Sequence, residues 1–166
     1  MAKITAHGLS AETPPGWDGQ IYVRRPLPAE ALLQTAAADA GLEPPVGEST
    51  APIVHLANFA LPADRADFGG GAVELMESGA VFIALIEHDP AVIDTPLFQH
   101  PVPWPLAPDD FSPEQMQRTL PGQCGTQRFF SASGRAFCLY VVLGSYRTRA
   151  LLTGVVNDAL ATVEIS

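Results

Sequence analysis

The sequence predicts an α+β fold in which an antiparallel sheet of about six strands is flanked by helices. Three observations lead to this prediction. Residues 127–166 have the pattern of a strand, a tight turn, a second strand, a helix and a last strand. Residues 80–87 are apolar on both faces, which is typical of a central strand covered on both sides. Turns or single helices join most of the strands, an arrangement that favours antiparallel pairing.

The sequence pattern of the N-terminal part predicts short strands followed by an irregular segment. Residues 4–13 alternate loosely and break at His7-Gly8, which indicates two short strands joined by a turn. A turn ending at Trp17 precedes an alternating strand over residues 20–24. Residues 26–50 include an Ala-rich stretch with helix propensity, but an isolated helix of this length is marginal in water. We therefore interpret residues 26–50 as an insertion or long loop within a single domain, 1–166.

The middle of the chain alternates strands with glycine-rich and proline-rich segments. Residues 53–60 predict a strand, and residues 72–77 predict a short helix after three glycines. Five prolines between residues 94 and 108 indicate an ordered loop without a regular helix. Ser112 and Pro113 have the residue types that begin a helical turn.

The C-terminal pattern is the clearest in the sequence. A turn at residues 131–134 leads into a strand over 136–143, and Ser145 is a candidate N-cap. Apolar pairs then recur every four residues from Leu151 to Leu160, which only a helix places on one face. Residues 162–165 predict a last short strand.

The formal net charge is −9, and the acidic residues are concentrated in the middle of the chain. Residues 26–117 hold fourteen acidic residues and one basic residue, Arg65, whereas residues 118–166 hold five arginines and two acids. We expect no nucleic-acid partner, because phosphate binding needs a basic surface. The asymmetry predicts either ordinary solubility or docking between opposite charges, to a basic partner or between copies.

Cysteine content and hydropathy indicate a cytoplasmic protein. Cys124 and Cys138 are too few for a disulfide scaffold, although a single bridge between them is an alternative. Cys138 alternates with apolar neighbours and is expected to behave as a small buried hydrophobe. The sequence shows no apolar core of a signal peptide and no run of about 18 apolar residues, so we expect no membrane span.

The residue types that carry catalysis occur without a known catalytic pattern. Glu87-His88-Asp89 follows a buried strand, and neighbouring strand residues point to opposite faces, which suits no common zinc site. His55 lies among apolar residues of a strand and is expected to be a hydrogen-bonded structural residue.

Residues 69–71 could cradle an anion before a helix, yet the Gly-Lys-Ser/Thr ending of a P-loop is missing. Cys124 would need a nearby base to act as a nucleophile. We therefore expect no catalytic residue, metal or cofactor.

Aromatic residues in or beside the proline-rich loops suggest a binding surface instead. Such side chains plug the edge of a core, or they line a shallow groove for a partner peptide or an apolar ligand. Together with two arginines of the basic C-terminal part, they make up the candidate partner-binding residues: Trp17, Phe98, Trp104, Phe111, Arg128 and Arg147.

An apolar strand followed by Pro-x-Gly-Trp occurs at residues 8–17, and a hairpin, a helix and a last strand end the sequence. These two segments resemble the PsbP-like superfamily, which includes PsbP, the Ran-binding Mog proteins, the LpqN-type proteins and adaptor chaperones of type VI secretion effectors. Residues 8–17 are similar to its opening of an apolar strand followed by Pro-x-Gly-Trp. The hairpin with Gly134, the strand over 136–143, the helix ending at Leu160 and the final strand are similar to its ending. The resemblance implies an α/β/α sandwich and work as a binding or scaffolding protein without catalysis. The Ala/Pro/Gly/Arg-rich composition also resembles that of small actinobacterial proteins.

The function that we expect is that of a non-catalytic adaptor or chaperone-like domain that binds another protein through a sheet face or its proline-rich loops. One alternative is a self-assembling structural subunit, in which acidic residues meet arginines of a neighbouring copy: Arg118, Arg128, Arg135, Arg147 or Arg149. A second alternative is a small-ligand-binding protein or hydrolase whose site is assembled from distant residues such as His55, Glu87 and His88.

Overall fold

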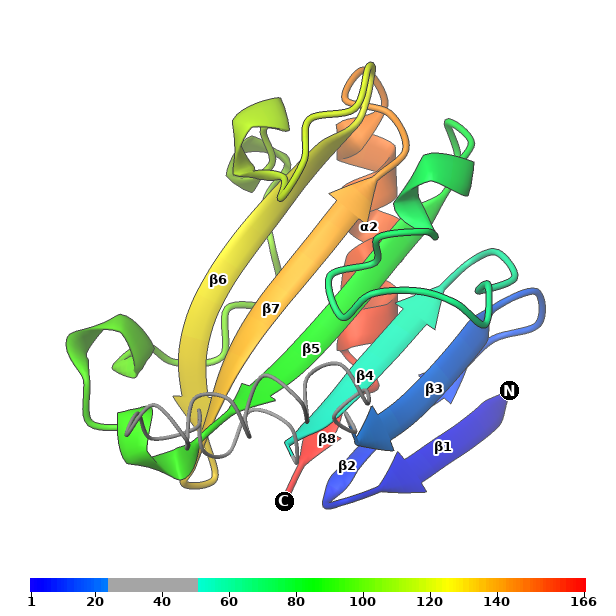
Figure 1. Ribbon diagram of the computed structural model, residues 1–166. Coiled ribbons are helices and arrows are strands. Elements are labelled where there is room, and N and C mark those ends of the chain that lie inside the picture. The colour runs from blue at the N-terminus through cyan, green and yellow to red at the C-terminus, as the bar shows by residue number, and fades with distance from the viewer. Residues whose placement is uncertain (24–50) are drawn as a thin grey trace, which may run out of the picture.

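The computed structural model describes residues 1–23 and 51–166 (Figure 1). These residues form two antiparallel sheets and one α-helix. The interpretation of residues 26–50 as an insertion or long loop lies outside the described residues.

The larger sheet has five strands in the order β3-β4-β5-β7-β6, and each neighbouring pair is antiparallel. Its strands are β3 (Asp18–Val23), β4 (Pro52–Ala57), β5 (Val81–His88), β6 (Cys124–Ala132) and β7 (Arg135–Leu143). The central position of β5, expected from its apolar character on both faces, is confirmed. Strands β3 and β6 are the two edges of this sheet.

The smaller sheet joins the two ends of the sequence. Its order is β1-β2-β8, with β1 (Ala2–Ala6), β2 (Leu9–Thr13) and β8 (Glu164–Ile165). His7 and Gly8 form the turn between β1 and β2, as expected, and both have positive φ angles. Leu9 pairs with Ile165, so the first hairpin and the last strand depend on each other.

Helical structure is sparse in the described residues. The helix α2 (Arg149–Leu160) agrees with the apolar pairs of the sequence, and Thr148 is its N-cap residue where Ser145 had been expected. The other helical pieces are three-residue 3₁₀ turns: η1 (Val73–Leu75), η2 (Pro90–Val92), η3 (Pro96–Phe98), η4 (Pro108–Asp110) and η5 (Pro113–Gln115). Proline at the first position of η2 to η5 is compatible with a helical start but not with a long helix over these closely spaced prolines.

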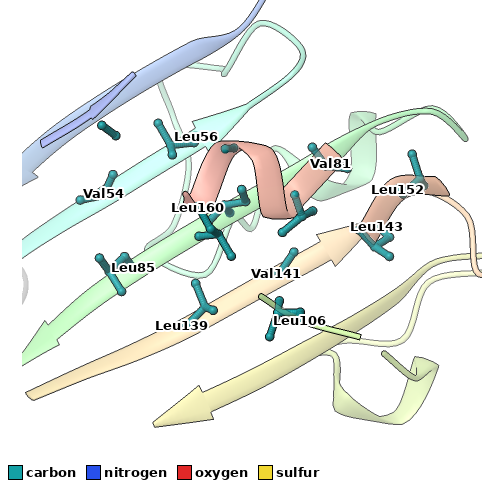
Figure 2. Close-up of a cluster of buried hydrophobic side chains, with 14 of the residues drawn as sticks. Val54, Leu56, Val81, Leu85, Leu106, Leu139, Val141, Leu143, Leu152 and Leu160 are labelled. Atoms are coloured by element: carbon teal, nitrogen blue, oxygen red, sulfur yellow. The ribbon is translucent and has the colours of Figure 1, made fainter. Parts of the chain in front are cut away.

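The large sheet separates two cores. On one face, α2 and the smaller sheet cover alternate residues of β4, β5 and β7, and we call this the helix-side core. Figure 2 shows Val54, Leu85 and Val141 of the sheet on the face that α2 covers with Leu152 and Leu160. On the other face, the loop-side core, residues of segments 59–76 and 116–120 pack on the intervening strand residues, which include Phe82, Ala84, Cys138 and Tyr140.

The predicted sandwich of a sheet flanked by helices is therefore wrong. Residues 1–23 and 51–166 are mostly β; their one α-helix covers one face of the large sheet, whereas loops with 3₁₀ turns cover the other. The expected helix over 72–77 is reduced to η1, because Gly69 and Gly71 at positive φ fold the preceding segment into a tight loop. A strand that is apolar on both faces requires cover on both sides, but that requirement does not specify helices.

Candidate functional site

A recess partly lined by apolar residues lies between the proline-rich segment and the edge strand β6. This groove has a volume of about 520 Å³ and is lined by Leu97, residues 100–103 and residues 127–129. Leu97 and Val102 are exposed to 52% and 38%, respectively, and both line this recess. We call this recess the β6 groove.

The proline-rich segment is fixed to the rest of the molecule on both sides of the groove. The N–H of Ser131 donates to the carbonyl of His100 over 3.1 Å. Further along, the side chain of Asn157 in α2 accepts from the N–H of Leu106 over 2.7 Å and donates to its carbonyl over 2.9 Å. The recess is therefore a built feature of the fold, since its wall is hydrogen-bonded at two points.

The edge of β6 has main-chain groups that point into this region. In an antiparallel pair, alternate residues direct their N–H and C=O groups toward the partner strand and away from it. The two-residue turn at Ser133-Gly134 makes Ala132 and Arg135 a hydrogen-bonded pair, so residues 125, 127, 129 and 131 point away from β7. Gly125 exchanges two hydrogen bonds with Ser112, and the N–H of Gln127 reaches the side chain of Gln115 over 3.4 Å. Among the described residues, the N–H and C=O of Phe129 have no such cover.

None of the four predicted aromatic residues lines this groove, and Trp17 precedes β3 at the opposite edge of the large sheet. Phe98 and Phe111 are buried, with 4% and 3% exposure. Trp104 packs edge-on against Phe130 with ring centroids 5.5 Å apart, and Trp17 packs against the helix-side core. These four side chains therefore pack against core residues and do not form a binding surface.

The two predicted arginines differ in their surroundings. Arg128 lines the groove and donates to Asp110 over 2.8 Å. Arg147 is exposed and has no hydrogen bond or ion pair within the described part of the chain. Of the other arginines invoked for self-assembly, Arg135 is engaged in a bidentate ion pair with Glu87, and Arg118 lies 3.9 Å from Glu74.

Sequence reasoning missed Leu97, Val102 and Phe129 as groove residues. A usable signal was the spacing of the prolines, because Pro96, Pro101 and Pro103 flank the two apolar side chains. A chain interrupted in this way cannot form an amphipathic helix that would turn both side chains into the core. Apolar residues between closely spaced prolines were therefore candidates for an exposed apolar wall.

His55 is the most strongly perturbed titratable residue on the loop-side face. Its ring is fully buried, its Nδ1 accepts from Nε of Arg65 over 2.7 Å, and its Nε2 donates to the carbonyl of Asp67 over 2.8 Å. Burial lowers the pKa of this imidazole to about 4. The hydrogen bond to the carbonyl of Asp67 raises the pKa in part, and the charge of Arg65 lowers it further. The imidazole is thus a neutral clamp for the loop that carries Arg65 and Asp67.

The other residues of the predicted alternatives do not converge with His55. Glu87 points to the helix-side face, where Arg135 holds it, whereas His55 lies on the loop-side face. The ring of His88 packs against Phe98 and Phe129 at the end of β5. None of the described recesses contains two of His55, Glu87 and His88.

The glycine-rich segment and the cysteines also have structural surroundings. The N–H of Gly71 donates to the carboxylate of Glu74 over 2.7 Å, so an acid of the chain itself occupies the predicted anion cradle. Cys124 and Cys138 are free and buried in different cores, on opposite faces of the sheet. Burial raises the pKa of each thiol to about 11, which disfavours the thiolate.

Comparison with protein-family models, curated proteins and solved structures finds no match for this chain. The resemblance to the PsbP-like superfamily therefore stays a prediction. In residues 1–23 and 51–166, no group of three or more His, Cys, Asp or Glu residues is placed to hold a metal ion. The same residues contain no helix long and apolar enough to cross a membrane.

Proposed function

We propose that this chain is a non-catalytic, adaptor-like domain that binds a segment of another protein in the β6 groove. The observation that carries the proposal is the exposure of Leu97 and Val102 in a recess whose wall is anchored by hydrogen bonds. Exposed apolar side chains in an ordered recess gain free energy when a partner covers them. A fixed wall lowers the entropy that binding would otherwise cost.

The chemistry of the reactive side chains favours this proposal over a hydrolase. The His55 imidazole is fully buried, the two thiols have raised pKa values, and the Glu87 carboxylate is held by Arg135. A general base or nucleophile must reach its substrate, which none of these groups does in the described arrangement.

Site-specific photo-crosslinking in the native host tests the proposal. A photoreactive amino acid at position 102 should capture a discrete partner, whereas the same residue at position 151 should not. Leu151 is the matched control, because it is 71% exposed and lies on α2, away from the groove. Val102→Glu should weaken binding of the captured partner at least about tenfold, because a carboxylate would be desolvated against apolar surface. Equal capture from both positions would contradict the proposal.

A further inference from the structure

We propose that the partner segment binds as an added strand on the edge of β6, with its main chain paired to Phe129 and an acidic side chain beside Arg128. This inference rests on the function proposed above, because it assigns the conformation and chemistry of what occupies the β6 groove. Addition of a strand to an open sheet edge is a general mode of peptide binding, in which main-chain hydrogen bonds hold the segment.

Some main-chain N–H and C=O groups on the edge of β6 are hydrogen-bonded within the molecule and others are not, and this pattern favours a short, extended partner segment. Ser112 covers the edge at Gly125, and His100 covers it at Ser131. Between these points, the N–H and C=O of Phe129 and the C=O of Gln127 point outward. Because a strand rises about 3.4 Å per residue, this interval accommodates roughly four partner residues.

The same two covers argue against pairing between the β6 edges of two copies. A second β6 is nine residues long and would bring its own segments at Ser112 and His100 against those of the first copy. A free segment of another protein enters the interval without this steric conflict. We therefore assign the groove to a partner in an extended conformation, not to a second copy.

The pleat of β6 predicts which side chains the partner presents. A partner residue opposite Phe129 shares the face of Phe129, and its two neighbours share the face of Arg128. Leu97 and Val102 supply apolar contact, so apolar residues are expected in the segment. None of the residues that line the groove is Asp or Glu, whereas Arg128 and His100 are among them. Arg128 donates to Asp110 through one terminal nitrogen, so a carboxylate of the partner would bind the remaining N–H groups of this half-exposed guanidinium, although the chain as a whole carries a net charge of −9.

The test begins with a phage-displayed library of random heptapeptides, selected on the full chain, and each selected peptide is then assayed for binding to the Val102→Glu and Leu97→Glu variants. Circular dichroism establishes that each variant is folded, and Leu151→Glu is the control that should retain binding. Selected sequences are then synthesised with a single N-methyl group at each main-chain nitrogen in turn.

Strand addition predicts an alternating result. N-methylation should weaken binding about tenfold or more at residues whose N–H faces β6, and much less at the residues between them, because one hydrogen bond is lost. Hydrogen exchange at the amide of Phe129 should slow when the peptide is bound. Replacing the acidic residue of the peptide by its amide should weaken binding to the wild type several-fold, but not to Arg128→Gln.

The possible failures are distinguishable. Peptides that need Val102 but show no alternation on N-methylation, or leave the Phe129 amide unprotected, overturn strand addition and leave the groove as a binding site. Groove-dependent peptides without an acidic residue overturn the assignment to Arg128. A library that yields only peptides bound equally by Val102→Glu, or no binder, overturns both the inference and the proposed function.

Discussion

The imidazole of His55 shows how a single buried residue fixes a loop without secondary structure. The carbonyl of Asp67 can only accept and Nε of Arg65 can only donate, so the proton of the neutral ring lies on Nε2. Arg65 continues the network to the carbonyl of Pro62 and the side chain of Gln20. Protonation of Nδ1 would remove the acceptor for Arg65 and place two cations in contact.

Acid should therefore destabilise this protein through His55. The pKa is lowered from 6.5 to about 4, so the unfolded state takes up the proton first as the pH falls. The free energy of unfolding should be independent of this group above pH 6.5 and fall by about 3 kcal/mol between pH 6.5 and 4. Urea unfolding at several pH values measures the slope of the free energy of unfolding against pH. His55→Gln should lack this component, whereas the exposed His100→Gln should retain it; an unchanged slope in His55→Gln would contradict the assignment.

The two thiols should be nearly inert in the folded state. With pKa values of about 11, both are protonated at pH 8, and both are shielded from solvent. Ellman's reagent should react with them orders of magnitude more slowly than with a free thiol, and with two equivalents per chain after unfolding in guanidinium. Rapid reaction of one thiol in the folded protein would show that its surroundings open readily.

At the scale of elements, Arg135, which is paired with Glu87 inside the large sheet, connects this sheet to the smaller one. Arg135 in β7 donates to Glu87 in β5 over 2.9 and 2.5 Å, to the carbonyl of His7 over 2.9 Å, and to the carbonyl of Ser166 over 3.1 Å. Both side chains of the pair are mostly buried, with 16% and 10% exposure. The guanidinium of Arg135 thus links three parts of the molecule by hydrogen bonds: the large sheet, the β1–β2 turn and the residue after β8.

Glu87→Gln should destabilise the protein by about 3 kcal/mol, because it leaves a buried guanidinium without its counter-charge. Thermal and urea unfolding measure this change. Glu77→Gln is the matched control, since Glu77 is exposed and its side chain has no ion pair within the described residues; its effect should be within about 0.5 kcal/mol. Equal effects of the two substitutions would show that the pair contributes little.

For the whole molecule, the sequence predicted elements better than their arrangement. The periodicity of Leu151 to Leu160 identified α2, and continuous apolar character identified β5 and β7, because these signals are local. The helices expected on both faces were wrong, since irregular segments, residues 59–76 and 116–120, cover the loop-side core within the described residues. The proline spacing around Leu97 and Val102 indicated candidates for an exposed apolar wall, but the groove itself depends on how this segment packs against β6, which no local pattern contains.

The pairing of β2 with β8 also has a consequence for the order of assembly. Ser10 and Glu164 are hydrogen-bonded neighbours although they lie 154 residues apart along the chain. The entropic cost of closing a loop rises with its length, and contacts between distant segments slow folding. The β6–β7 hairpin, by contrast, needs only a two-residue turn. The β6–β7 and β1–β2 hairpins can therefore form from local contacts, whereas the addition of β8 to β2 has to wait until these distant segments meet.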